Sequence, residues 1–241
     1  MRIDKLLANV GFGSRKEVKK ILKAGVVKVD DEVVSDPKTH VNPEEQEVTV
    51  HGERIVYKEF IYLMMNKPAG YLSATEDLSQ ETVIDLLEYE DAIYDPFPVG
   101  RLDKDTEGLL IITNDGQLAH QLTSPKKHVP KTYFAHILGE VTEDDVKAFK
   151  QGVVLDDGYV TKPGELSIVE SGPQSIIYLT ITEGKFHQVK RMFEAVGKKV
   201  TYLKRVKMGP LPLDEELEIG EYRELTDEEV DLLKNAKGVN A

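Results

Sequence analysis

Charged residues gather between a proline-broken loop and an apolar segment in the middle of this chain. The stretch Gly100-Arg101-Leu102-Asp103-Lys104-Asp105-Thr106-Glu107-Gly108 precedes Leu109-Leu110-Ile111-Ile112, which predicts a buried strand. Upstream, Asp95-Pro96-Phe97-Pro98 can continue neither a helix nor a central strand. Because a rigid strand holds an adjoining loop in position, a carboxylate of this stretch, Asp103, Asp105 or Glu107, is a candidate nucleophile of the kind that forms covalent intermediates with sugars or rings. A solvated turn with ordinary surface carboxylates explains the same residues.

The sequence offers little machinery for other chemistry. It contains no cysteine, which excludes disulfides and thiolate metal sites. The six histidines are scattered without metal-ligand spacing, and no glycine pattern typical of a phosphate-cradling loop or a dinucleotide fold is present. We therefore expect no metal and no small-molecule cofactor.

The charge distribution is uneven although the formal net charge is −12. Residues 1–28 hold eight Lys or Arg against Asp4 and Glu17, and residues 185–207 hold eight against Glu194. Ten carboxylates lie between Asp214 and Asp231. Two basic faces and an acidic back suit a protein that binds RNA. Ordinary charged helix surfaces produce similar clusters, so composition alone leaves both interpretations open.

Neither a membrane segment nor a secretory signal is predicted. No apolar run approaches the roughly 20 residues that span a bilayer. The first residues, Met1-Arg2-Ile3-Asp4-Lys5, lack the apolar run of a signal peptide. We expect a cytoplasmic protein without membrane contact.

Residues 1–58 predict a small separate domain. Ile3, Leu6, Leu7 and Val10 recur at helical spacing, and a second helix begins at a Ser14 to Glu17 capping box and ends at Gly25. Short strands are expected at 26–29, 32–34 and 47–50. Polar and acidic residues then predict a linker near residues 56–59.

Residues 59–241 predict an α+β domain. Strands are expected at 60–65, 109–112 and 176–181, and helices at 82–87, 117–122, 142–150, 187–196 and 226–233. The elements mix without a regular βαβ rhythm. We predict a large mixed, mostly antiparallel sheet flanked by helices.

Several motifs, in order along the chain, resemble those of the RsuA-type pseudouridine synthases, which isomerise a uridine in ribosomal RNA. The stretch around Asp103 resembles their nucleophile motif. Further landmarks are Asn66-Lys67-Pro68-Ala69-Gly70-Tyr71, Thr123-Ser124-Pro125, Lys131-Thr132-Tyr133, Thr161-Lys162-Pro163, the segment 183–193 and Gly220-Glu221-Tyr222-Arg223. The N-terminal segment resembles the S-four-type RNA-binding module shared with a small-subunit ribosomal protein. Together the motifs cover nearly the whole chain.

The resemblance implies roles for individual side chains. It places the essential aspartate at Asp103, a tyrosine that lies against the target base at Tyr133, and at Lys190 a basic partner that keeps the carboxylate ionised. Arg101 is expected to help take the uridine out of its helix. Substrate contacts are also expected from the neighbours of Lys190, namely His187, Gln188 and Arg191.

Blander interpretations of these residues remain open. Tyr133 fits a half-buried strand position, and from the residues alone Lys190 and Arg191 fit solvated positions on a helix better than a site. We expect Asp105 and Glu107 to be turn residues around the nucleophile, because Thr106-Glu107-Gly108 predicts a bend.

The N-terminal module is expected to contact RNA phosphates. A helix start flanked by basic side chains suits such contacts. The residues expected to make them are Arg2, Lys5, Ser14, Arg15, Lys16, Lys19, Lys20 and Lys28.

The motifs also narrow the expected substrate. Residues 187–193 and 103–106 are closer to the small-subunit type, whereas large-subunit relatives usually carry an arginine in the place of Lys190. We therefore expect a monomer acting on a uridine of 16S ribosomal RNA within a small-subunit assembly intermediate. A large-subunit enzyme and a non-catalytic RNA-binding assembly factor are alternatives. A glycoside hydrolase is disfavoured by the absence of tryptophan for sugar stacking and by the basic patches.

Overall fold

The computed structural model describes residues 1–236 and divides into two compact units. One unit comprises Met1–Ile61 together with Leu87–Pro96, and the other comprises Tyr62–Leu86 together with the chain from Phe97 onward. The division predicted after residue 58 did not foresee that Leu87–Pro96 belongs with the N-terminal residues. Within the described residues, no helix is long and apolar enough to cross a membrane.

The N-terminal unit is a helix pair beside a small antiparallel sheet, as predicted. The sheet order is β2-β1-β3-β4. The capping box at the start of the second helix is confirmed, because the Ser14 and Glu17 side chains bond reciprocally to each other's backbone N–H. The elements are α1 (Ile3–Asn9), α2 (Arg15–Lys23), β1 (Val27–Val29), β2 (Glu32–Val33), β3 (Val48–Val50), β4 (Glu53–Arg54) and α3 (Tyr89–Ala92).

Local sequence explains how this unit folds. Asp30 and Asp31, between β1 and β2, have φ values of 50° and 67°. Left-handed conformations at both central residues are typical of a tight hairpin turn. Buried apolar residues from α1, α2, β1 and β3 form the core of the unit, among them Leu6, Leu22 and Val50.

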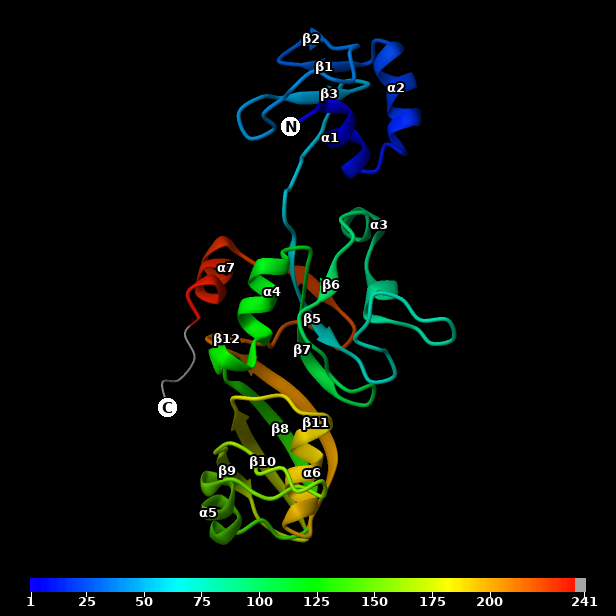
Figure 1. The fold of residues 1–241 in the computed structure, drawn as a ribbon. Helices are drawn as coiled ribbons and strands as arrows, with labels where there is room; N and C mark the ends of the chain where they lie inside the picture. Colours follow the sequence, from blue (N-terminus) through cyan, green and yellow to red (C-terminus); the bar gives the residue numbers. More distant parts are fainter. Residues whose placement is uncertain (237–241) are drawn as a thin grey trace. The chain divides into compact units, whose positions relative to one another are not determined.

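The larger unit is built on a nine-stranded sheet, which confirms the predicted mixed, mostly antiparallel architecture (Figure 1). The order is β13-β5-β7-β11-β8-β10-β9, with β12 beside β11 and β6 beside β7. The pairing of β11 with β7 is parallel and the other pairings are antiparallel. The strands are β5 (Tyr62–Lys67), β6 (Phe97–Pro98), β7 (Glu107–Thr113), β8 (Lys131–Leu138), β9 (Glu165–Glu170), β10 (Gln174–Ile181), β11 (Lys199–Met208), β12 (Leu211–Pro212) and β13 (Tyr222–Glu224).

The helices of this unit form close to where the sequence predicts them. They are α4 (Gly116–Thr123), α5 (Glu143–Gln151), α6 (Gln188–Ala195) and α7 (Asp227–Lys234). The helix predicted at 82–87 is a single 3₁₀ segment, η1 (Val83–Leu86), and a second one, η2 (Pro125–Lys127), follows α4. Asp115 stops β7 and starts α4, because its carboxylate accepts from the N–H groups of Gln117 and Leu118.

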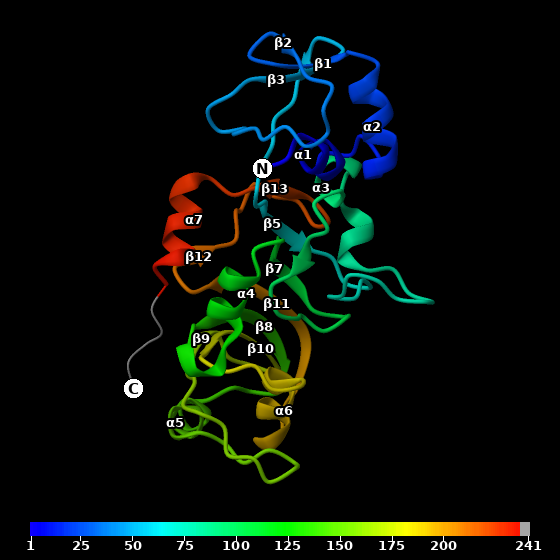
Figure 2. The same ribbon diagram turned by 45° about the horizontal axis from the view of Figure 1, so that its top comes forward.

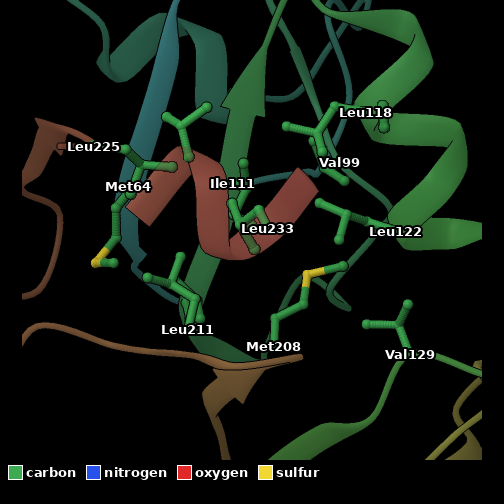
Figure 3. Packing of buried hydrophobic residues seen from close by; sticks show 13 residues of the cluster. Met64, Val99, Ile111, Leu118, Leu122, Val129, Met208, Leu211, Leu225 and Leu233 are labelled. Carbon is green, nitrogen blue, oxygen red and sulfur yellow. The ribbon is translucent and has the colours of Figure 1, made fainter. Parts of the chain in front are cut away.

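Apolar side chains from α4 and α7 pack on β5 and β7. The two helices lie side by side in Figures 1 and 2 and contact each other. Figure 3 shows Met64 and Ile111 of the sheet among Leu118 and Leu122 from α4 and Leu233 from α7. This core holds β7 in place, and the loop that carries Asp103 leads directly into β7.

Candidate active site

Asp103 lies on a loop that is fixed at several points before β7 begins. The Thr106 N–H donates to the Asp103 carbonyl at 3.0 Å, which closes a tight turn. Ser73 accepts from the Leu102 N–H at 3.1 Å and donates to the Leu102 carbonyl at 3.0 Å. The bend predicted at residues 106–108 was therefore placed too late: the turn spans 103–106, and Glu107 already belongs to the strand.

A buried lysine holds the same loop through hydrogen bonds to its backbone carbonyls. Lys67 ends β5, and its side chain is inaccessible to solvent. Its ammonium donates to the carbonyls of Pro68 at 2.9 Å and Thr106 at 3.0 Å, and more weakly to those of Asp103 at 3.3 Å and Lys104 at 3.4 Å. Burial lowers the pKa of Lys67 to about 8, although Asp105, Glu107 and Asp103 oppose this. The sequence reasoning assigned Lys67 no role, although a lysine closing an apolar strand was a visible signal.

A glycine permits the close strand pairing that brings Tyr133 toward the loop. Gly108 has φ +99°, and a Cβ placed there would lie 2.2 Å from the Arg205 carbonyl oxygen. Arg205 on β11 pairs with Gly108 on one side and with Tyr133 of β8 on the other. The backbone positions of β7, β11 and β8 thereby align in one row across the sheet.

An open cleft of about 820 Å³ runs over Asp103. Its size suits a nucleoside, since small-molecule sites usually enclose about 300–1,000 Å³. The lining residues include Arg101, Asp103, Phe186, His187 and Lys190. A smaller hollow of about 70 Å³ shares Arg101, Asp103, His187 and Lys190 with the cleft and adds Tyr133. The structure therefore brings together the carboxylate, the phenol ring and the ammonium that the sequence analysis singled out.

Lys190 binds two carboxylates in this cleft. Its Nζ lies 3.2 Å from Asp103 Oδ2 and 2.6 Å from Asp105 Oδ1. Burial alone would lower the pKa of Lys190, but the hydrogen bonds that its ammonium donates to both carboxylates, with their negative charges, outweigh burial and raise the pKa above its ordinary value. Burial by itself would raise the pKa of Asp105, but its hydrogen bond to Lys190 and the positive charge of that ammonium, with smaller contributions from a backbone hydrogen bond and His187, together lower it. His187 Nε2 lies 3.7 Å from Asp103 Oδ1 on the other side.

Comparisons with known proteins match two stretches of the chain to two families. Residues 61–195 match the family model described as RNA pseudouridylate synthase, and residues 1–47 match the S4 domain. The chain belongs to the RNA pseudouridylate synthase family. This membership confirms the resemblance stated from the motifs and sets aside the glycoside hydrolase alternative.

Full-length relatives and a solved structure agree with this assignment. The chain is 60% identical over 97% of its length to 98% of an uncharacterized RNA pseudouridine synthase, YtzG, from Bacillus subtilis. It is 42% identical over 95% of its length to 97% of ribosomal small subunit pseudouridine synthase A from Yersinia pestis. A crystal structure of a pseudouridylate synthase matches with a TM-score of 0.68 at 37% identity, covering 97% of this chain and 99% of that one.

Gln188 braces the loop that precedes α6. Its Nε2 donates to Glu183 Oε1 at 2.7 Å, and its Oε1 accepts from the Lys185 N–H at 2.8 Å. Glu183 also accepts from Tyr159 Oη and from the Lys162 N–H. Gln188 lines the small hollow but is 4% exposed, so most of its hydrogen-bonding capacity is used within the protein.

Arg191 is not brought into the cleft with the other predicted residues. Its guanidinium binds Asp156 and Asp157 on the loop after α5 and donates to the Phe186 carbonyl at 3.4 Å. A helix turns by about 100° per residue, so the neighbour of Lys190 faces another direction. The structure therefore makes Arg191 a brace between two loops.

A third cavity, of about 260 Å³, adjoins the cleft and is lined by Arg101, Tyr133, Lys131 and Arg205 among others. Burial, assisted by the positive charge of Arg205, lowers the pKa of Lys131 to about 8. Neither Lys131 nor Arg205 was given a role from sequence, because their meeting depends on strand register. In the described part of the chain, no three His, Asp or Glu side chains form a group that could hold a metal ion.

The N-terminal unit, called the S4 unit here because residues 1–47 match the S4 domain, presents most of its predicted RNA-binding residues to solvent. Side chains that are exposed include Lys5 and, on α2 and β1, Arg15, Lys16, Lys19, Lys20 and Lys28. Two of the predicted contacts have structural partners: the Arg2 guanidinium binds the buried Asp4 carboxylate at 2.7 Å, and the Ser14 hydroxyl binds Glu17 at 2.6 Å. The exposed lysines and Arg15 are the residues of this set whose side chains are both exposed and without either of these two contacts.

Proposed function

We propose that this protein isomerises a uridine to pseudouridine in small-subunit ribosomal RNA, with Asp103 as the nucleophile. One observation carries the proposal. Asp103, Lys190 and Tyr133 line one hollow that shares Asp103 and Lys190 with the open cleft, and the Lys190 ammonium lies 3.2 Å from the Asp103 carboxylate. We infer the target RNA from relatives that are named ribosomal small subunit pseudouridine synthase A. Those names describe the relatives, and the substrate of this chain is part of the proposal.

The reaction needs only groups that this chain supplies. The bond between N1 of uracil and the sugar breaks, the base turns, and a bond forms between C5 and the sugar. A proton leaves C5 and N1 ends protonated, so no atoms are gained or lost. Asp103 attacks either carbon 6 of the ring or the anomeric carbon, or assists a glycal route. Carboxylates act as such nucleophiles when ionised.

The surrounding side chains are assigned matching tasks. Lys190 stays positively charged, since its carboxylate contacts raise its pKa, and its ammonium pairs with the Asp103 carboxylate at 3.2 Å. The ring of Tyr133 supports the detached base, and its hydroxyl moves the C5 proton. Arg101 is exposed at the rim of the cleft, where it occupies the gap that the everted uridine leaves in the RNA. Taking a base out of its stack costs a few kcal/mol.

The S4 unit anchors the RNA in this proposal. Its exposed lysines on α2 and its Arg15 neutralise phosphates, and such contacts make affinity fall with salt. We expect the protein to act as a monomer in the cytoplasm on a small-subunit assembly intermediate. Mapping pseudouridines in both ribosomal RNAs from cells with and without the protein identifies the target. A difference confined to large-subunit RNA would overturn the choice of substrate and leave the reaction class intact.

The nucleophile is tested with a pair of isosteric variants. Asp103→Asn should abolish pseudouridine formation in single-turnover assays on ribosomal RNA, while the dissociation constant for RNA stays within a few fold. Asp105→Asn is the matched control, because Asp105 binds the same ammonium and loses the same charge. It should retain the rate within about tenfold, the upper range of one lost helper contact. Retained turnover in Asp103→Asn would end the proposal for this residue.

A further inference from the structure

Phe186 is the most informative side chain of the cleft that the proposed chemistry does not use. Its side chain is 75% exposed, although phenylalanine is normally buried. It lines the same cleft as Asp103 and Lys190. An isolated exposed apolar residue on an ordinary surface needs no explanation. Phe186, however, is exposed in the cleft that holds the candidate nucleophile, and an exposed phenylalanine at that position needs a functional explanation.

The Phe186 ring is already half of a stack. It lies on the His187 ring with 3.7 Å between ring centroids and 19° between planes. His187 Nε2 in turn lies 3.7 Å from Asp103 Oδ1. One face of the Phe186 ring is thus covered by imidazole, and its high exposure shows that much of the ring remains open. A planar ligand can therefore stack on the open part of the Phe186 ring, on the side away from the nucleophile.

The loop under Phe186 is held by hydrogen bonds and ion pairs even though the ring is exposed. The Phe186 carbonyl accepts from Arg191, which Asp156 and Asp157 hold in place. Gln188 ties the residue before Phe186 to the buried Glu183 carboxylate. A ring on a braced loop loses little conformational entropy when a ligand stacks on it, which favours binding.

Cationic side chains line the same cleft as the ring, together with the carboxylates of Asp103 and Asp105. Lys185 precedes Phe186, and Arg101 and Lys104 line the same cleft and are exposed. A planar apolar face beside cations is the combination that binds unpaired nucleic acid, where bases stack on aromatic rings and phosphates meet basic groups. A purely apolar protein partner would gain nothing from these charges.

We propose that Phe186, supported by His187, is a stacking site for an unpaired nucleobase that flanks the target uridine. The inference rests on the proposed function, since it assigns the neighbour of the uridine that Asp103 attacks. When the uridine leaves its stack, the adjacent base loses a partner, and the Phe186 ring replaces it. The protein therefore selects RNA whose target uridine is next to a base free to stack. Any base has a suitable face, so the site adds affinity with little sequence preference.

The test compares Phe186 variants by RNA affinity and by the rate of the bound complex. Phe186→Ala should raise the dissociation constant for a deproteinised small-subunit rRNA transcript by about 5- to 150-fold, the range of one lost base stack. Phe186→Tyr should bind like the native protein, and Phe186→Leu should bind like Phe186→Ala, because leucine is apolar without a stacking face. Tyr178→Ala is the control, since Tyr178 is another exposed aromatic residue and does not line the cleft.

A second measurement identifies the partner base. In a fragment containing the mapped uridine, an abasic nucleotide at the correct flanking position should weaken native binding as much as Phe186→Ala does, and combining both changes should add little. The inference would be overturned if Phe186→Ala bound RNA as tightly as the native protein, or if Phe186→Leu bound as tightly as Phe186→Tyr. It would also be overturned if the losses of affinity from Phe186→Ala and from an abasic nucleotide were fully additive at every flanking position. Pseudouridine formation at saturating RNA is followed throughout. If the native protein itself forms none, the proposed function fails instead.

Discussion

Replacing Lys67 with methionine should uncouple stability from activity. The variant removes the ammonium that donates to four backbone carbonyls, those of Asp103, Lys104 and Thr106 in the nucleophile loop and that of Pro68 after β5. Methionine keeps an unbranched side chain of similar length. Only the bonds to Pro68 and Thr106, at 2.9 and 3.0 Å, have good lengths. Leaving one buried and one part-buried acceptor unpaired costs at most about 2–6 kcal/mol.

Relief of the buried charge offsets much of that cost. Burial lowers the pKa of Lys67 from 10.5 to about 8. The difference corresponds to about 3 kcal/mol of free energy that opposes the charged form in the folded protein. The free energy of unfolding of Lys67→Met should therefore differ from the native value by no more than about 3 kcal/mol in either direction.

The reaction rate should respond far more strongly. Without the ammonium, the turn at 103–106 loses its support, and the Asp103 carboxylate is no longer held in one position. A misplacement of about 1 Å lowers rates by about 10²-fold. Single-turnover pseudouridine formation measures the rate, and urea unfolding measures stability. Lys150→Met, an exposed lysine on α5, controls for the lost charge.

A Lys67→Met enzyme that reacts within about threefold of the native rate would refute the bracing role, whatever its stability. Amide hydrogen exchange adds a direct readout of the loop. The Thr106 N–H, which donates to the Asp103 carbonyl, should exchange faster in the variant. Unchanged protection at Thr106 would likewise show that the loop does not depend on this lysine.

Three further predictions follow from the same region. The folded pKa of Lys67, about 8, lies below its value of about 10.4 in an unfolded chain, so the unfolded state binds more protons between these limits. Native stability relative to Lys67→Met should thus rise by up to about 3 kcal/mol from pH 7.5 to 10, and a flat difference in urea midpoints would contradict the burial argument. Gly108→Ala should destabilise by at least about 2 kcal/mol more than Gly70→Ala, because both have φ near +98° but only at Gly108 does a Cβ meet backbone; equal urea midpoints would refute the contact. Lys190→Met should slow single turnover by at least about 100-fold and Lys190→Arg should restore most of the rate, whereas an active methionine variant would remove the lysine from the mechanism.

Local patterns in the sequence predicted much of the scaffold. The apolar run at Leu109–Ile112, followed by Asn114-Asp115-Gly116, predicted β7 and its end, and Asp115 does cap α4. The Ser14 to Glu17 spacing predicted a capping box that the structure contains. Such features depend on residues a few positions apart, so spacing alone is sufficient to find them. The family itself was recognisable because its motifs keep their order along the chain.

Residue spacing could not decide which side chains meet. Asp103 and Lys190 are 87 positions apart, and their contact depends on how β7, β11 and α6 are placed. Adjacent residues of α6 face different directions because a helix turns between them, and only the placement of α6 decides which of them reaches the cleft: Lys190 does, while Arg191 braces the loop under Phe186.

By itself, the sequence determined the family, the mixed sheet and the identity of the candidate nucleophile, because motif order and local periodicity can be read directly from the order of the residues. Only the tertiary structure decided that Lys67 supports the nucleophile loop, that Gly108 lets β11 approach β7, and that the Phe186 ring is exposed in the cleft. The physical reason is that burial and strand register are set by the whole sheet, through contacts between residues far apart in the chain.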